Sequence, residues 1–336
     1  MKKKILLIIC LVMANVATFA QTASVMLLHE GGDPRFFNPA HITDALEVAT
    51  DGDMLLLSEG VFVGDFTITK RVSLIGAGAK TIISGGITIA MNDTTMLSSY
   101  LLDALYLTGS LNITKEINGL KIRKCQFSNI DFNAKTDYAV MENCYCREAF
   151  YLNPERGAGG NLAPNLAGMT IYNSKIGRIE SDAPSAGAAV FDHCNIGRLY
   201  NDYRNNTATY QGCIIGGWTN SSYGNKAVFI NCLYVQQYGY TVISNCTNEG
   251  CWPMEDGESI TDELEYQNAN TYPEYGDDDI AYLKDERRCN DGTEVGITGG
   301  PLPFTLSSTL PTVSEASYSV DSKEKKLKVT LKVKTN

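Results

Sequence analysis

The chain has 336 residues, with 28 Lys and Arg against 38 Asp and Glu, and a formal net charge of −10. Lys2–Lys4 and the six lysines from Lys323 to Lys334 lie near the two ends, so the residues between them are strongly acidic. An acidic body repels nucleic acid and anionic membrane surfaces, and no basic patch with interleaved aromatic residues is present. Composition therefore argues against nucleic-acid binding.

Residues 1–20 are typical of a signal peptide. Lys2–Lys4 give a positive start, Ile5–Val16 an apolar run, and Thr18–Ala20 a cleavage site of small residues. The apolar run is too short for a membrane span, and no other stretch is long and apolar enough to cross a bilayer. We therefore expect a secreted protein, located in the periplasm, at the cell surface or outside the cell.

Residues 21–53 predict an irregular N-terminal segment followed by a capping helix. Asn38 is a suitable helix cap, and Pro39 suits the first helical position. One face of this helix is apolar and comprises Ile42, Ala45, Leu46 and Ala49. A short amphipathic helix of this kind would cover the open end of a solenoid.

One short pattern recurs between Leu120 and Asn248. The aligned position recurs at intervals of 19, 30, 20, 19, 19 and 14 residues, and comprises Cys125, Cys144, Ser174, Cys194, Cys213, Cys232 and Cys246. Three residues earlier lies an apolar side chain in every unit: Ile122, Met141, Ile171, Phe191, Tyr210, Phe229 and Ile243. The alternation predicts short strands with one buried face, and a period near 20 residues predicts a solenoid of stacked units.

The position just before the aligned residue predicts a sharp bend. It reads Lys124, Asn143, Asn173, His193, Gly212, Asn231 and Asn245. Asn, Gly and His tolerate a left-handed backbone best, and Lys124 is the exception. We expect the Asn side chains of stacked bends to bond one another along the stack.

In this repeat geometry the chain resembles the right-handed parallel β-helix, or pectate-lyase-like, superfamily. The run from Asp51-Gly52-Asp53 through Gly60 and Lys70 to Gly76 is also similar to the opening coils of exported β-helix proteins. The resemblance implies an all-β fold, a right-handed parallel β-helix solenoid of about ten coils over residues 54–250, with the N-terminal helix as its cap. The superfamily carries many activities, so the resemblance concerns the fold.

The cysteines divide into two groups. Neighbouring parallel strands hold equivalent Cβ atoms too far apart for disulfides, so we expect the aligned cysteines, Cys125, Cys144, Cys194, Cys213, Cys232 and Cys246, to be buried free thiols. Cys251 and Cys289 lie beyond the predicted stack and are the candidate disulfide.

The C-terminal third changes composition. Residues 251–304 are acidic and predict a cap over the second open end, and Asp277, Asp278 and Asp279 are either part of its solvated surface or a Ca²⁺ site. Residues 305–336 predict a Ser/Thr/Pro linker and one amphipathic strand from Leu327 to Val333. That strand is either an edge strand of the body or a tail that docks a partner.

The strongest group of candidate catalytic residues lies on two adjacent predicted coils. Equal offsets from the aligned position bring Arg178 beside Arg198, and Asp182 beside Asp202. Enzymes of the superfamily act on polysaccharides from the outer face of one sheet, where lyases neutralise a uronate carboxylate and hydrolases use paired carboxylates. The alternative is that these four side chains neutralise one another as a solvated ladder of ion pairs.

Tyrosines crowd the same coils. Tyr200, Tyr203, Tyr223 and Tyr238 are candidate platforms for sugar rings, because a flat ring with a polar edge suits a sugar face, or they pack against the body. We therefore expect an exported β-helix protein that presents a non-catalytic surface to polysaccharide. The alternatives are a polysaccharide lyase or glycoside hydrolase, and a structural or adhesive module.

Overall fold

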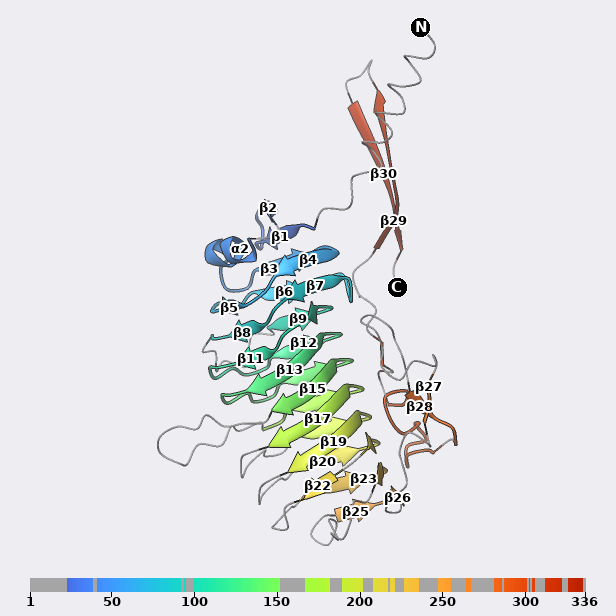
Figure 1. Ribbon diagram of the computed structural model, residues 1–336. Helices are drawn as coiled ribbons and strands as arrows, with labels where there is room; N and C mark the ends of the chain where they lie inside the picture. Colours follow the sequence, from blue (N-terminus) through green and yellow to red (C-terminus); the bar gives the residue numbers. More distant parts are fainter. Residues whose placement is uncertain are drawn as a thin grey trace.

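The computed structural model describes residues 23–38, 41–91, 94, 100–151, 167–181, 189–201, 208–216, 218–220, 227–235, 247–254, 264–266, 281–285, 287–300, 302, 304–305, 312–321 and 326–334. These residues form an all-β parallel solenoid, in which two sheets face each other and each coil adds strands to both (Figure 1). The predicted fold class is confirmed.

Sheet A has twelve strands among the described residues, and from β3 onward its neighbours are parallel. In spatial order they are β2 (Arg35–Phe37), β1 (Val25–Leu28), β3 (Met54–Leu57), β6 (Ser73–Ile75), β9 (Leu101–Asp103), β12 (Lys121–Arg123), β14 (Val140–Glu142), β16 (Thr170–Tyr172), β18 (Val190–Asp192), β20 (Thr209–Gln211), β23 (Val228–Ile230) and β25 (Thr247–Glu249).

Sheet B has fourteen strands among the described residues. Its main path is β26 (Trp252–Met254), β24 (Leu233–Val235), β21 (Ile214–Ile215), β19 (Asn195–Asn201), β17 (Lys175–Ser181), β15 (Tyr145–Tyr151), β13 (Gln126–Phe132), β10 (Tyr106–Leu107), β7 (Thr81–Ser84) and β4 (Gly60–Val63). Beside this path lie β5 (Phe66–Ile68), β8 (Ile87–Ile89), β11 (Leu111–Ile113) and β22 (Trp218–Asn220).

The interior of sheet A is a single column of buried apolar residues. The register pairs Leu55, Leu74, Leu102, Ile122, Met141, Ile171, Phe191, Tyr210 and Phe229 in succession. Phe191 and Tyr210 stack with ring centroids 5.0 Å apart, and Tyr210 and Phe229 with centroids 5.1 Å apart. The predicted buried face of the repeat is confirmed from Ile122 to Phe229.

The bend before each aligned residue is left-handed, as predicted. Positive φ angles occur at Lys124 (50°), Asn143 (53°), Asn173 (41°), His193 (52°), Gly212 (58°) and Asn231 (52°). Gly212 has a second reason to lack a side chain, because a Cβ there would lie 2.8 Å from His193 Nε2. The side chains of Asn143 and Asn173 bond C-terminal residues rather than each other, and Asn245 lies outside the described residues.

The aligned cysteines are buried free thiols among the described residues, namely Cys125, Cys144, Cys194, Cys213 and Cys232. Each thiol donates to the carbonyl two residues earlier, for example Cys213 Sγ to Gln211 O at 3.3 Å. Burial raises the pKa of Cys213 and Cys232 well above its ordinary value. These thiols therefore stay protonated and pack as small apolar side chains, and they do not act as nucleophiles.

The last coil of the ladder differs from its prediction. Cys251, and not Cys246, continues the column: Cys251 Sγ lies 3.3 Å from Cys232 N, and Gly250 before it has φ +62°. Asn248 pairs with Phe229 and so stands where earlier coils have an apolar residue. Cys246 itself lies outside the described residues.

The N-terminal end is more regular than predicted. Residues expected to be irregular form β1 and β2, which extend sheet A by antiparallel pairing onto β3. The capping helix is present as α2 (Ile42–Val48), but it begins three residues later than expected. His41 N donates to Asn38 O, so Asn38 forms a turn before the helix instead of capping it.

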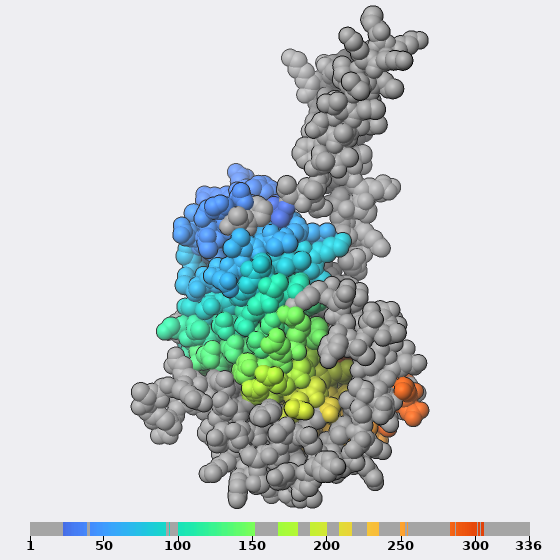
Figure 2. Space-filling model, in the orientation of Figure 1, coloured from blue at the N-terminus to red at the C-terminus, as the bar shows by residue number. Residues whose placement is uncertain are grey.

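The C-terminal region also differs from the prediction. The described acidic segment includes a separate antiparallel pair, β27 (Leu264–Tyr266) with β28 (Ala281–Leu283), and residues 287–305 lie along the flank of the coils rather than across their end (Figures 1 and 2). The predicted linker contains β29 (Thr312–Asp321), which pairs antiparallel with β30 (Lys326–Lys334). The predicted C-terminal strand thus finds its partner within the chain.

A substitution in the aromatic stack tests whether the buried column stabilises the solenoid. Replacing the buried ring in Phe229→Ala should lower the free energy of unfolding by about 3–5 kcal/mol, because it removes apolar contact and leaves a cavity. Phe36→Ala, at a side chain that is 71% exposed, is the control and should change it by about 0.5 kcal/mol or less. Urea unfolding followed by circular dichroism measures both, and equal losses would contradict a core organised around this column.

Candidate functional site

The outer face of sheet B holds two of the four charged residues predicted from the repeat, Arg178 and Arg198. Arg178 of β17 pairs in register with Arg198 of β19, as the equal offsets indicated. A glycine precedes each arginine in the sequence. A Cβ at Gly177 would lie 2.2 Å from Arg147 O, so a larger residue there would push β17 away from β15. The two arginines therefore lie side by side on a closely stacked stretch of sheet.

Arg178 is held in place by two neighbours. Its Nη2 donates to the hydroxyl of Tyr151 at 3.3 Å, and its Nε donates to a carboxylate oxygen of Glu180 in an ion pair. The hydrogen bond to Tyr151 and the pairing with Glu180 raise the pKa of Arg178 further above its ordinary value. The Arg178 side chain is 42% exposed, so the fixed cation remains accessible from solvent.

Two adjacent columns of residues on this face contain the arginines and the carboxylic and phenolic residues beside them. In the first, the register places Asn129, Ala149, Arg178 and Arg198 in succession. In the second, it places Asp131, Tyr151, Glu180 and Tyr200 in succession. Carboxylic and phenolic residues thus alternate beside the arginines, and we call the two columns together the arginine face.

Asp131 is a site residue that the sequence reasoning missed. It is half-buried, and burial raises the pKa of its carboxyl above the ordinary value. Glu180, two strands away in the same column, is instead paired with Arg178. Two carboxyls in one column thus occupy different electrostatic surroundings, which is the arrangement that separates an acid from a base.

Several predicted site residues cannot be placed. Asp182, Asp202, Tyr203, Tyr223, Tyr238, Asp277, Asp278 and Asp279 lie outside the described residues. Tyr200 is placed by its backbone alone, between Glu180 and Thr219 in the register of sheet B. Within the described ranges, no group of three or more His, Cys, Asp and Glu side chains is arranged to hold a metal ion.

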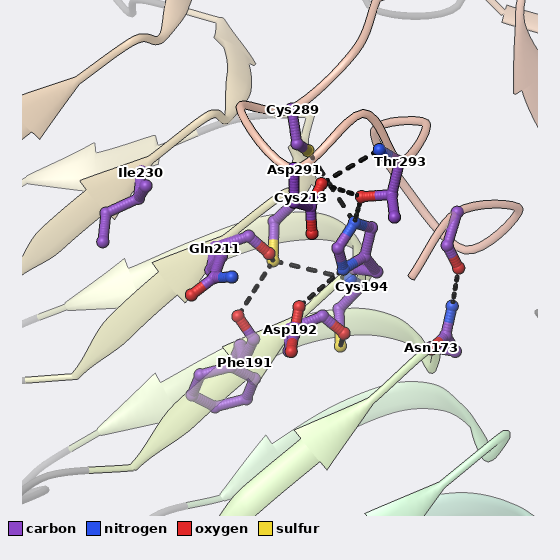
Figure 3. A network of polar contacts seen from close by, with 12 residues as sticks. Asn173, Phe191, Asp192, Cys194, Gln211, Cys213, Ile230, Cys289, Asp291 and Thr293 are labelled. Atoms are coloured by element: carbon purple, nitrogen blue, oxygen red, sulfur yellow. Dashed lines mark hydrogen bonds and ion pairs between the residues drawn. The ribbon is translucent and has the colours of Figure 1, made fainter. Parts of the chain in front are cut away.

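A second polar cluster surrounds His193 at the bend between the sheets. Figure 3 labels Asp192, Cys289, Asp291 and Thr293 of this cluster. His193 Nδ1 lies 2.5 Å from Asp192 Oδ1, and His193 Nε2 lies 2.8 Å from Thr293 Oγ1. The Thr293 hydroxyl donates to Asp291 Oδ1 at 2.6 Å. This cluster joins the solenoid to a segment 100 residues later in the chain.

Cys289 belongs to the same cluster, so the predicted disulfide with Cys251 is not formed. Cys289 Sγ lies 3.7 Å from His193 Nε2 and is buried, whereas Cys251 continues the interior ladder at Cys232. Both thiols are free. The physical reason is the position of Cys251, since a residue inside the ladder is not available to a segment that packs outside it.

A cavity of about 450 Å³ opens at the N-terminal end, beside β1, β2 and α2. His29 Nδ1 lies 2.6 Å from Asp53 Oδ1, and Thr50 N donates to Asp53 Oδ2 at 2.8 Å. Burial acts to raise the pKa of Asp53, but the bonds from Thr50 and His29 outweigh it and the pKa is lowered. Both oxygens of Asp53 are thus engaged, which indicates that it fastens the N-terminal end.

Comparisons with models of protein families, with curated proteins and with solved structures find no match to this chain. Among the described residues, no helix has the length and apolar character needed to cross a membrane.

The free thiols can be checked by alkylation without reductant. We expect N-ethylmaleimide to label both Cys251 and Cys289 once the chain is unfolded in urea, because neither is bonded to another cysteine. Cys194, Cys213 and Cys232 should resist labelling in the folded chain, since all three are buried. Peptide mass spectrometry reads each site, with a reduced sample as control, and a peptide pair joined through Cys251 and Cys289 would contradict the assignment.

Proposed function

We propose that the protein is a secreted, pectate-lyase-like β-helix protein that binds anionic polysaccharide on the arginine face of sheet B. Binding, rather than cleavage, is its primary activity. Its partner is a polymer with a carboxylate on most sugar rings, and nucleic acid is disfavoured by the net charge of −10. No cofactor is part of this proposal: Asp277, Asp278 and Asp279 are predicted from the sequence to form a solvated acidic surface, with a Ca²⁺ site as the alternative.

One observation carries the proposal: two arginines in register on adjacent strands of an exposed sheet face. Their backbones repeat at about 4.8 Å, so a polymer lying along the stack meets a cation at each of two successive coils. Arginine binds carboxylates through paired N–H groups, and Arg178 is already oriented by Tyr151 and Glu180. The phenol of Tyr151 adds a ring with a polar edge beside the cations.

Removing both cations should abolish most of this binding. For Arg178→Ala with Arg198→Ala we expect the dissociation constant for polygalacturonate or alginate to rise at least about tenfold, because each charged hydrogen bond contributes about 1.5–3 kcal/mol. Lys121→Ala is the matched control, since Lys121 is an exposed cation on sheet A. Calorimetry at low and high salt measures the change.

Two results would refute the proposal. The first is a wild-type chain that binds no uronate polymer at low salt. The second is a double variant that binds as tightly as the Lys121→Ala control. A neutral glucan should bind equally weakly to all three chains.

A glycoside hydrolase is the second candidate function, and Asp131 is the observation that favours it. Asp131 has a raised pKa and would serve as the acid, while Glu180 would serve as the base that activates water. The two residues are two strands apart, which is about 9.5 Å between backbones and near the separation of carboxyls in inverting hydrolases.

This candidate predicts a dependence on pH. Because the acid must be protonated, activity should fall as pH rises through the raised pKa of Asp131, and Asp131→Asn should remove at least about 99% of it. Release of reducing ends from uronate polymers is the measurement, with Glu142→Gln on sheet A as the control. If no reducing ends are released at any pH tested, the hydrolase function is excluded and polysaccharide binding remains the proposed function.

A further inference from the structure

The described residues of the segment 287–305, namely 287–300, 302, 304 and 305, lie back along the solenoid against the direction of stacking, and we call them the strap. Gly296 N donates to Gly212 O at 2.7 Å, Ile297 N to Asn195 Oδ1 at 3.2 Å, and Thr305 N to Asn143 Oδ1 at 3.1 Å. The strap therefore passes from the coil of Gly212 to the coil of Asn143 and joins coils that are distant in the stack.

Main-chain atoms of the strap make most of its polar contacts. Asn173 Nδ2 donates to Ile297 O at 3.1 Å and to Gly299 O at 2.6 Å, and Asn173 is fully buried. Apolar contacts add to these, because Val295 packs with Ile214 and Leu233, and Phe304 packs with Tyr145. The strap is thus a docked segment that adds no strand to either sheet among the described residues.

His193 is the imidazole of this contact, and counting hydrogen-bond donors and acceptors around its ring gives its protonation state. Thr293 Oγ1 donates its hydrogen to Asp291, so it can only accept from His193 Nε2. His193 Nδ1 faces the carboxylate of Asp192 at 2.5 Å and must donate there. Both ring nitrogens therefore carry a hydrogen, and the ring is an imidazolium cation.

The charges around His193 agree with this state. Asp192 comes from its own strand end, while Asp291 and Cys289 come from the strap, and the Gly212 and Gly300 backbones lie against the ring. Burial acts to lower the pKa of His193, but the bonds and charges of Asp192 and Cys289 outweigh it and raise the pKa to about 9. The hydrogen bonds from the Thr293 hydroxyl and backbone lower the pKa of Asp291, and the charge of His193 contributes in the same direction.

We infer that the strap is a detachable segment whose closed position is latched by the protonated His193, through the chain Asp192–His193–Thr293–Asp291. When the ring loses a proton, one nitrogen turns a lone pair toward either Asp192 or Thr293, and that hydrogen bond is lost. Opening then exposes the Cys289 thiol, together with the apolar strip at Ile214 and Leu233 that the strap covers.

The raised pKa of His193 determines how the stability of the closed strap changes with pH. The folded value, about 9, lies above the ordinary 6.5, so the latch stabilises the closed strap fully below pH 6.5. This contribution declines above pH 6.5 and is lost as pH rises through about 9. The strap should therefore be closed at neutral pH and loosen in alkaline solution.

Alkylation of Cys289 in the full chain tests the latch. The rate with iodoacetamide is divided by the rate for the same thiol in urea at the same pH, which cancels the reactivity of the thiolate. We expect this protection of Cys289 to fall about tenfold or more between pH 7 and pH 10. Cys213, which lies inside the solenoid, is the internal control and should stay protected at both pH values.

The chain offers a matched variant, because Asn occupies the same left-handed position in three other coils, at Asn143, Asn173 and Asn231. His193→Asn should keep the bend but lose the cation, so Cys289 protection should be low at pH 7 and nearly constant up to pH 10. Thr293→Val, which leaves the solenoid unchanged, should also lower protection at pH 7. A wild-type protection that stays flat from pH 7 to pH 10, or an unchanged step in His193→Asn, would overturn the proposal.

Discussion

The repeat distance between stacked coils is the constraint on which the rest of the structure depends. Parallel neighbours lie about 4.8 Å apart, so each position in a coil becomes a column that runs along the solenoid. A single coil cannot bury its own apolar side chains, and burial is achieved only between coils. The stacked rings of Phe191, Tyr210 and Phe229 show the result, since each ring is covered by the rings of its neighbours. The column, rather than the strand, is therefore the unit of stability.

Columns also explain how much could be predicted from the sequence. The apolar column and the left-handed bends were predictable because the same residue types return at a constant offset, and even Lys124 follows the bend of its neighbours. The last coil was predicted wrongly for two reasons. Cys246 matches the aligned residue type but lies five positions before Cys251, and Asn248 stands where the repeat has an apolar residue three positions before the aligned cysteine. A constant interval of 19 residues from Cys232 to Cys251 was the better guide.

The site was predictable only where it follows the repeat. Arg178 and Arg198 have equal offsets and lie together. A register shift in β15 places Ala149, and not Glu148, beside Arg178, and neither the Tyr151 contact nor the burial of Asp131 has a signature in spacing. The strap has no repeat at all. The surface that the strap covers does leave a signal in the sequence of the coils. The residue after the aligned position changes there from Lys175 and Asn195 to the apolar Ile214, Leu233 and Trp252.

That change divides the outer face of sheet B into two kinds of surface. Where the first position of the strand is apolar, as at Ile214 and Leu233, the chain covers it with its own strap. On the preceding strands β17 and β19, three residues beyond this first position and about 10 Å along the strand, Arg178 is partly exposed and Arg198 is exposed. A polymer bound along the arginine face would thus lie beside the strap for several coils. Because both features share one sheet, a change in the strap at His193 would alter the surroundings of the proposed polysaccharide surface without any movement of the coils.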